Sequence, residues 1–359
     1  MAETYLVCGA QTTEWGKAKA GLSIFKYDPA DVSVKLISDT NEWNPTFILV
    51  IFTCNDISEK NNVGVSAFKV ADWKTGTLTK LGSYDAGGQT ACYAQQVDRT
   101  LLIANYGEFG GGSVCTFRLN DDDTIKERVS LIEYTQFSDV YPNRQFCAHP
   151  HCAHYHAQSG QVIVCDLGFD AIWLYHLDPD TSKLTPNEKC PMIKTDPGSG
   201  PRHAAVHPKN PNWVYVTLEL STEVLFLTFD GQQLTSKQKL SALQAELPQL
   251  DTKIPPLCSH LECTPDGQYL YVAVRGPPSN MASYRIDQSN GQLSFVGNYS
   301  TVTPVPRHFT FDPTNRMLFV SMQEGDCIAV FECGIDGSLK HQKNLEGVPT
   351  PQCLQFVQI

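Results

Sequence analysis

The chain has 359 residues, 42% of them hydrophobic and 18% charged, and its formal net charge is −11. This is ordinary globular composition, and the acidic balance argues against nucleic acid or a membrane surface as a partner. No apolar run is long enough to cross a bilayer, and the N-terminus lacks the pattern of a secretory signal. The 13 cysteines include no CxxC pair, and we interpret them as mostly buried thiols of a cytoplasmic protein.

Short β-rich segments recur along the chain at intervals of about 40 to 60 residues, the spacing of four-stranded propeller blades. Seven apolar runs can be identified, at residues 5–10, 47–52, 101–107, 162–168, 213–220, 269–276 and 317–323. Each is followed by a turn and a second run, at residues 22–27, 65–70, 113–119, 172–177, 224–229, 282–286 and 327–332. A third, more polar run comes next, and most units also begin with an apolar run, so a full unit has four antiparallel strands.

The two ends of the chain complement each other. The first unit lacks an inner strand, whereas the tail 352–359 is a strand-like run with no unit of its own. Pairing the two would complete a ring and remove an exposed sheet edge. We therefore predict an all-β protein, a seven-bladed β-propeller that occupies residues 1–359 as a single domain and is closed by pairing of the N- and C-terminal strands.

Two points about this fold stay open at the sequence level. Seven loosely similar hairpins could also form a sandwich or two barrels, although neither needs the missing strand to reappear at the other end. The second unit is irregular, because Asn44-Pro45-Thr46 leads directly into a continuous run over residues 47–54. We expect two strands of that unit to be merged into one.

Polar residues recur at two positions of the repeat. The start of the inner strand carries His149, His151, Arg202-His203, Ser259-His260 and Arg307-His308, so five of the ten histidines share one repeat position. The end of the next strand carries Asn105, Asp166, Glu219, Arg275 and Gln323. Because these strands are antiparallel, both sets should face the same solvent-accessible mouth of the central channel. Convergent titratable groups of this kind predict a functional pocket.

Several of these residues also have a structural explanation. A lone histidine at a strand start is usually a satisfied structural group, and Asp166 before Gly168 could be a turn residue. Glu219 is different, because Leu218 and Leu220 flank it in a strand, and its natural partners are arginines of neighbouring blades.

A zinc site is a further alternative, with His149 and His151 joined by His203 or Asp166. The sequence contains no Gly-rich phosphate loop, nucleophile elbow or HExxH motif. We therefore expect no metal and no other cofactor, and activity should survive chelation.

Nine stretches of the chain carry a family resemblance: Ala104-Asn-Tyr-Gly107 with Gly111-Gly-Ser-Val114, His149-Pro-His151, Asp166-Leu-Gly168, Gly198-Ser-Gly-Pro-Arg-His203, Glu219-Leu-Ser221, Thr264-Pro-Asp-Gly-Gln-Tyr-Leu-Tyr-Val-Ala273, Arg275-Gly276 and Pro306-Arg-His-Phe309. In this order and spacing the sequence resembles the propeller lactonase family, which includes bacterial-type 6-phosphogluconolactonases and fungal carboxymuconate-cyclizing enzymes. The resemblance extends over nearly the whole chain.

The resemblance implies a metal-independent hydrolysis of a sugar lactone, most specifically 6-phosphogluconolactone, in the channel mouth. His151 would be the general base, with Glu219 as an alternative base or as the group that orients an arginine. Arg202 or Arg275 would stabilise the oxyanion. The expected substrate contacts come from His149, His203, Arg307, Asn105, Asp166 and Gln323. The partner is thus a small anionic lactone, and the oligomeric state is not predicted.

Two other functions remain in competition. One is lactonisation of a carboxylated muconate, which needs the same arginines, and the other is a non-catalytic propeller that binds a protein or metabolite on the same face. The chain also departs from the family pattern. Tyr93 stands where these lactonases often have a histidine, Glu108-Phe109-Gly110 looks like an insertion, and the second unit is short. All three touch the mouth or its rim, so they bear on substrate choice.

Overall fold

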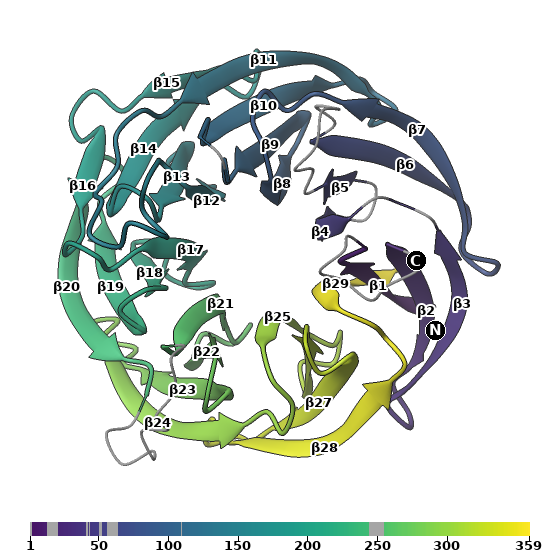
Figure 1. Ribbon diagram of the computed structural model, residues 1–359. Helices are drawn as coiled ribbons and strands as arrows, with labels where there is room; N and C mark the ends of the chain where they lie inside the picture. The colour runs from purple at the N-terminus through teal and green to yellow at the C-terminus, as the bar shows by residue number, and fades with distance from the viewer. Residues whose placement is uncertain are drawn as a thin grey trace.

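The computed structural model describes residues 2–12, 21–40, 42, 44–49, 52–55, 64–108, 110–243 and 255–359. These residues form seven antiparallel sheets that stand as blades around a central axis (Figure 1). The predicted all-β, seven-bladed propeller is confirmed, and a sandwich or a pair of barrels is ruled out. In the described part of the chain, no helix is long and apolar enough to cross a membrane.

Blades are numbered here in chain order, and their strands from the axis outward. Blade 1 consists of β29 (Pro351–Gln358), β1 (Thr4–Ala10), β2 (Leu22–Asp28) and β3 (Ser33–Thr40). Blade 2 consists of β4 (Pro45–Leu49), β5 (Phe52–Asn55), β6 (Val65–Asp72) and β7 (Thr77–Tyr84). Blade 3 consists of β8 (Ala91–Val97), β9 (Thr100–Asn105), β10 (Ser113–Leu119) and β11 (Ile125–Glu133).

Blade 4 has β12 (Pro150–His156), β13 (Gln161–Asp166) and β14 (Ala171–Leu177), with the short strands β15 (Leu184–Pro186) and β16 (Met192–Lys194) both paired to β14. Blade 5 has β17 (Pro201–Val206), β18 (Trp213–Leu218), β19 (Glu223–Phe229) and β20 (Leu234–Ser241). Blade 6 has β21 (Leu257–Cys263), β22 (Tyr269–Arg275), β23 (Asn280–Ile286) and β24 (Leu293–Ser300). Blade 7 has β25 (Pro306–Phe311), β26 (Met317–Met322), β27 (Cys327–Cys333) and β28 (Leu339–Glu346).

The chain ends close the ring as predicted. Strand β29 pairs antiparallel with β1, from Thr4 opposite Gln358 to Ala10 opposite Pro351. It takes the innermost place of blade 1 and contacts the inner strands β25 and β4 on either side (Figure 1). Tyr27 of blade 1 also donates its hydroxyl to Asp312 of blade 7 at 3.1 Å. The last strand therefore supplies the inner strand that the first unit lacks.

The second blade corrects one expectation. Residues 47–54 do not form a single merged strand, because β4 and β5 are separate and pair antiparallel, with Leu49 opposite Phe52. Blade 2 thus has all four strands. The run contains no glycine, proline or asparagine between the two strands, so the usual sequence signals of a turn are absent there.

The core lies between adjacent blades, where apolar side chains of neighbouring sheets interdigitate. One cluster joins Val224 and Phe226 of blade 5 to Val272, Val274 and Tyr284 of blade 6. The middle strands have apolar residues on both faces because both faces are covered, as in β13, where every residue is buried. All cysteines except Cys147 and Cys333 are buried, which confirms their interpretation as mostly buried thiols.

Every inner strand carries a β-bulge at its start. The register shifts lie between Pro45 and Phe47, Ala91 and Tyr93, Pro150 and Cys152, Pro201 and Ala204, Cys258 and Leu261, and Pro306 and His308, and opposite Gly9 and Ala10 in blade 1. A bulge places one extra residue on its strand and re-aims the neighbouring side chains. This repeated irregularity at one mouth of the channel sets the geometry of the candidate site.

Candidate active site

Three arginines surround one buried carboxylate at this mouth. Arg202 Nε and Arg275 Nη2 both lie 2.8 Å from Oε2 of Glu219, and Arg144 forms an ion pair with Oε1. Only 2% of the Glu219 side chain is exposed, against 3% for Arg202, 14% for Arg275 and 35% for Arg144. The structure thus confirms that Glu219 is paired with arginines, but only Arg275 comes from the neighbouring blade 6, whereas Arg202 belongs to the same blade as Glu219 and Arg144 to the loop before blade 4. The cluster has three positive charges for one negative charge.

Backbone hydrogen bonds hold Glu219 in place. Its N–H donates to the carbonyl of Gly200 at 2.7 Å, and its own carbonyl accepts the N–H of Cys258 at 3.2 Å. Gly200 has a φ of 63° and a Cβ there would meet Leu220 at 2.7 Å, so the turn requires glycine. The backbone of Glu219 is therefore fixed between blades 5 and 6.

Arg144 comes from the loop that leads from blade 3 into blade 4. The next residue, Gln145, donates its side-chain amide to Leu167 O and to Asp170 Oδ1, both at 2.8 Å. Asp170 in turn accepts the N–H groups of Gly198 and Gly200, each at 2.8 Å. One buried aspartate thus ties the Arg144 loop to the turn that holds Glu219.

The electrostatics of the cluster favour a permanent carboxylate. Burial raises the pKa of Glu219, but the nearby charges of Arg275, Arg144 and Arg202 outweigh it and hold this pKa well below its usual value. Burial and the neighbouring Arg275 lower the pKa of Arg202 to about 9, with Glu219 opposing the shift. At neutral pH the glutamate is ionised and the arginine still carries its charge.

The bulges bring His151, Arg202 and Arg307 to equivalent positions. In blades 4 and 7 the bulged residues are His151 and Arg307, and in blade 5 the bulge places Arg202 and His203 opposite one residue of β18. Burial, followed by the charge of Arg202, lowers the pKa of His151 well below its usual value, and Glu219 opposes this. His151 is 6% exposed and is a neutral imidazole at neutral pH.

The expectation that five histidines share one repeat position is wrong. His203, His260 and His308 come one residue after the position of His151, and His149 precedes its strand. The three form a second layer inside the channel, where His203 Nδ1 lies 3.0 Å from His260 Nδ1 and His260 stacks on His308 at 4.2 Å. The bulges separate the two layers because they add a residue to each strand.

Aromatic rings complete this inner layer. Tyr93 of blade 3 occupies the position in its inner strand that His203 has in blade 5. The centroid of its ring lies 5.6 Å from that of His203 and 4.9 Å from that of Phe47. Its hydroxyl is 3.2 Å from His154 Nδ1. Tyr93, the departure from the family pattern noted above, therefore packs into the channel below the arginines.

Asn105 and Asp166 do not join the cluster. Each pairs with the first residue of its inner strand, a position one residue before that of Glu219. Because neighbouring residues of a strand point to opposite faces, Asn105 and Asp166 do not face the same way as Glu219. Asp166 Oδ1 accepts the N–H groups of His149, Gly168 and Phe169 at 2.8, 3.1 and 3.2 Å. Asn105 donates to Ala86 O at 3.1 Å and to Ser113 Oγ at 2.9 Å. Both side chains are fully buried and hold loops at the mouth.

The position of Glu219 is taken by Tyr106 in blade 3. Both residues follow a strand end and donate their N–H to the residue before the inner strand, Tyr106 to Thr90 O at 2.9 Å and Glu219 to Gly200 O. Tyr106 stacks on His149 at 4.0 Å and 13°, and accepts a hydrogen bond from His149 Nδ1 on its carbonyl at 2.9 Å. His149 is fully buried, so it supports Tyr106 from below.

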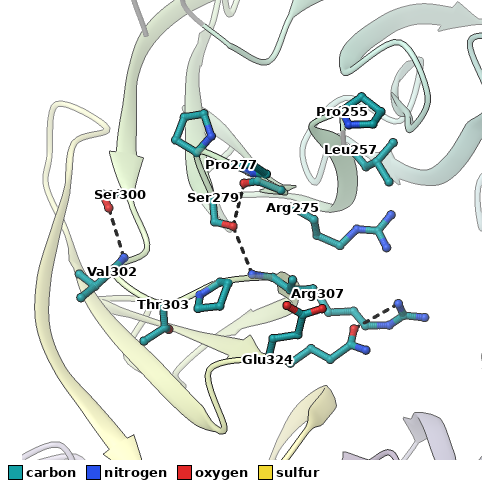
Figure 2. Close-up of a pocket in the computed structure, with 15 residues that line it drawn as sticks. Pro255, Leu257, Arg275, Pro277, Ser279, Ser300, Val302, Thr303, Arg307 and Glu324 are labelled. Atoms are coloured by element: carbon teal, nitrogen blue, oxygen red, sulfur yellow. Dashed lines mark hydrogen bonds between the residues drawn. The ribbon is translucent and has the colours of Figure 1, made fainter. Parts of the chain in front are cut away.

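A pocket opens beside the arginines, between blades 6 and 7. It has a volume of about 630 Å³, and Arg275, Arg307 and Gln323 line it (Figure 2). Arg307 Nη1 donates to Gln323 Oε1 at 3.4 Å, and the guanidinium groups of Arg275 and Arg307 point to the same side in Figure 2. Arg275 therefore belongs both to the carboxylate cluster and to this pocket.

The zinc alternative finds no support in these contacts. His149 is engaged with Tyr106, and Asp166 is engaged with backbone N–H groups. Across the described ranges, no three histidine, cysteine or acidic side chains are grouped so that they could hold a metal ion.

Two residues of the site were missed in the sequence. Arg144 lies in a loop that does not repeat, so the comparison of equivalent blade positions does not detect it. Tyr106 is next to Asn105 in the Asn-Tyr-Gly turn, and the pairing register that makes Tyr106 the counterpart of Glu219 cannot be read from one sequence. Phe109 of the expected insertion lies outside the described residues.

Comparisons with known proteins agree with this fold. Residues 5–356 match the family model described as lactonase, 7-bladed beta-propeller. A 6-phosphogluconolactonase of Bacillus subtilis (strain 168) is 31% identical over 299 residues, which cover 82% of this chain and 80% of that protein. The periplasmic gluconolactonase PpgL of Pseudomonas aeruginosa superimposes with a TM-score of 0.88 over 99% of both chains, at 25% identity.

The chain belongs to the lactonase family of seven-bladed β-propellers. The predicted family is thereby confirmed, and with it the enzyme class, a lactone hydrolase. A further relative, named 6-phosphogluconolactonase in Formosa agariphila, is 25% identical and covers 89% of this chain.

Proposed function

We propose that the protein hydrolyses a sugar lactone that carries an anionic group, most specifically 6-phosphogluconolactone. The observation that carries this proposal is the group of three arginines around Glu219, with Arg307 nearby, in a protein whose net charge is −11. Positive charge concentrated against the overall field attracts an anion to this mouth. The names of the relatives in Bacillus subtilis and Formosa agariphila point to the same substrate.

Unsatisfied donors support an anion or oxyanion at the cluster. Nη1 of Arg202 and Nε of Arg275 are buried and have no hydrogen-bond partner among the described residues. A buried donor without a partner costs about 1–3 kcal/mol, which a bound oxygen would recover. Donors that are fixed before the reaction are also what stabilises a developing oxyanion most strongly.

The reaction would proceed by general-base hydrolysis. Neutral His151 takes a proton from water as the water oxygen attacks the lactone carbonyl carbon, and Arg202 or Arg275 stabilises the resulting oxyanion. When the tetrahedral intermediate collapses, the ring C–O bond breaks and the imidazolium returns the proton to the leaving alkoxide. The product is the ring-opened hydroxy acid, which releases a proton to solvent and becomes the carboxylate.

Glu219 acts in this scheme as a positioning residue and not as the base. Both of its oxygens are already paired with guanidinium groups, so the carboxylate has no oxygen free to accept a proton from water. In the same scheme, Arg307, which donates to Gln323, would hold the substrate's phosphate.

The test is a hydrolysis screen over phosphorylated and plain aldonolactones, with the spontaneous rate subtracted. We expect kcat/KM for 6-phosphogluconolactone to exceed that for gluconolactone by at least about tenfold, or 1.4 kcal/mol. Equal values would contradict the anion requirement. If no lactone is hydrolysed above background, the hydrolase proposal fails, and lactonisation of a carboxylated muconate becomes the next reaction to assay.

A further inference from the structure

The pocket between blades 6 and 7 has an apolar wall that the proposed reaction does not use. Arg275 and Arg307 lie at one end of this cavity of about 630 Å³ (Figure 2). The wall is formed by Pro255, Leu257, Pro277, Pro278, Val302 and Pro304. In Figure 2, Pro255 and Leu257 lie on the same side as the guanidinium groups, and Pro277 and Val302 lie away from them. The pocket is therefore amphipathic, with apolar side chains both beside and beyond its two charged groups.

The size and chemistry of this pocket do not match a phosphorylated sugar lactone alone. A volume of about 630 Å³ lies within the range of about 300–1,000 Å³ that holds drug-sized ligands. A sugar lactone presents hydroxyl groups over most of its surface, and these gain nothing against an apolar wall that offers no partners. Among the residues that line the pocket, Arg275 and Arg307 carry the positive charges, so they are the favoured place for an anion.

The loop that carries part of the wall is held in a strained conformation. Val302 and Val305 have φ values of 67° and 62°, a region that β-branched residues seldom adopt. Hydrogen bonds fix this loop: Val305 N donates to Ser279 Oγ at 3.2 Å, and Ser279 Oγ donates to Gly276 O at 2.9 Å (Figure 2). Strain that the surrounding structure maintains is concentrated at ligand sites.

We infer that this wall is a subsite for an apolar substituent of an anionic ligand whose phosphate or carboxylate is held by Arg275 and Arg307. The inference rests on the proposed function, because it extends the substrate class from phosphorylated sugar lactones to anionic lactones that carry an aryl or alkyl group. The two arginines set the anion end, and the proline and valine wall sets the preference for an apolar substituent.

The binding test uses two phosphate monoesters that a lactonase does not hydrolyse. Phenyl phosphate and methyl phosphate share the anionic group and differ in the apolar part, and their dissociation constants are measured by titration calorimetry at fixed salt. We expect phenyl phosphate to bind at least about tenfold more tightly. Equal affinities would overturn the inference.

Variants of the strained valines locate the effect. Val302→Asn and Val305→Asn remove the apolar contact, and asparagine tolerates a positive φ better than valine does, so the fold should be kept. We expect the preference for phenyl phosphate to fall below about threefold while methyl phosphate binds as before. The matched control is Val32→Asn, since Val32 has a φ of 57° in the turn between β2 and β3. A preference that persists in both pocket variants would contradict the assignment of the wall.

Lactone hydrolysis separates this inference from the proposed function. If the enzyme hydrolyses 6-phosphogluconolactone but shows no phenyl phosphate preference, the wall is not a subsite and the proposed function stands. If no lactone is hydrolysed and the phenyl phosphate preference is still lost in Val302→Asn, the subsite is real and the reaction assigned to it is wrong.

Discussion

Nε of Arg202 lies 2.8 Å from Oε2 of Glu219, with only 3% and 2% of the two side chains exposed. Arg275 approaches the same carboxylate oxygen at 2.8 Å. Two guanidinium groups on one buried oxygen would repel each other without the carboxylate between them. Glu219 therefore makes it possible for an acidic protein to keep several arginines together at one mouth of its channel.

Glu219→Gln tests this relationship. The change keeps the shape and removes the charge, so buried arginines lose their counter-ion. Removing one partner of a buried ion pair costs about 3–5 kcal/mol, and we expect Tm to fall by about 6 °C or more. A bound anion should replace the missing charge, so millimolar phosphate should raise Tm more in this variant than in the wild type, as differential scanning calorimetry can measure.

The matched control is Asp196→Asn, which breaks an exposed pair. Lys239 is bonded to Asp196, whose side chain is 70% exposed, and exposed pairs contribute about 0–1 kcal/mol. A Glu219→Gln protein with the same Tm as this control, and no added response to phosphate, would show that the carboxylate does not hold the arginines.

Arg202→Lys tests the planar guanidinium group of the buried arginine. Lysine keeps the charge but loses bidentate geometry. We expect kcat/KM for an anionic lactone to fall by at least about tenfold, or 1.4 kcal/mol. Arg202 is 2% exposed and does not lie at the open mouth expected from the sequence, so Tm should fall as well. Steady-state kinetics on the folded variant is the measurement, and an unchanged kcat/KM would remove Arg202 from the mechanism.

The repeat made the fold predictable from the sequence. Seven repeated units, the first of which lacks an inner strand, and a C-terminal strand without a unit of its own together fit one closed ring. The pairing of Glu219 with arginines was predictable too, since a charged residue between two leucines needs a buried partner. The finer geometry was not. Asn105 pairs with the first residue of its inner strand, whereas Glu219 follows the residue that does so, and the counterpart of Glu219 in blade 3 is therefore Tyr106. By the same pairing the counterpart of His151 is Arg202 and not His203. Arg144 stands in a loop without a counterpart in other blades, so no repeat could indicate it.

Deleting residues 352–359 tests ring closure. The deletion removes most of β29 and exposes the edge of β1. It also removes Leu354 and Cys353 from two hydrophobic clusters of the core. We expect the truncated protein to lose its cooperative unfolding transition or to melt well below the wild type, as followed by circular dichroism. Deleting Ile359 alone, which is 51% exposed, is the control and should leave Tm unchanged. Wild-type melting of the longer deletion would mean that the ring does not depend on its last strand.

The pH dependence of kcat/KM tests the role of His151. The free enzyme needs this imidazole neutral, and its pKa lies well below the usual value because of burial and the charges of Arg202 and Arg307. A base with a lowered pKa stays deprotonated as pH falls through the usual histidine range, so we expect no loss of kcat/KM between pH 8 and about pH 6. Activity should fall only below that. Arg307→Gln removes one of the positive charges that depress the pKa of His151, so it should move the acidic limb to higher pH in addition to weakening substrate binding.

The measurement is a background-corrected pH–rate profile of both proteins. An acidic limb near pH 6.5 that is identical in the two would show that His151 is not the base.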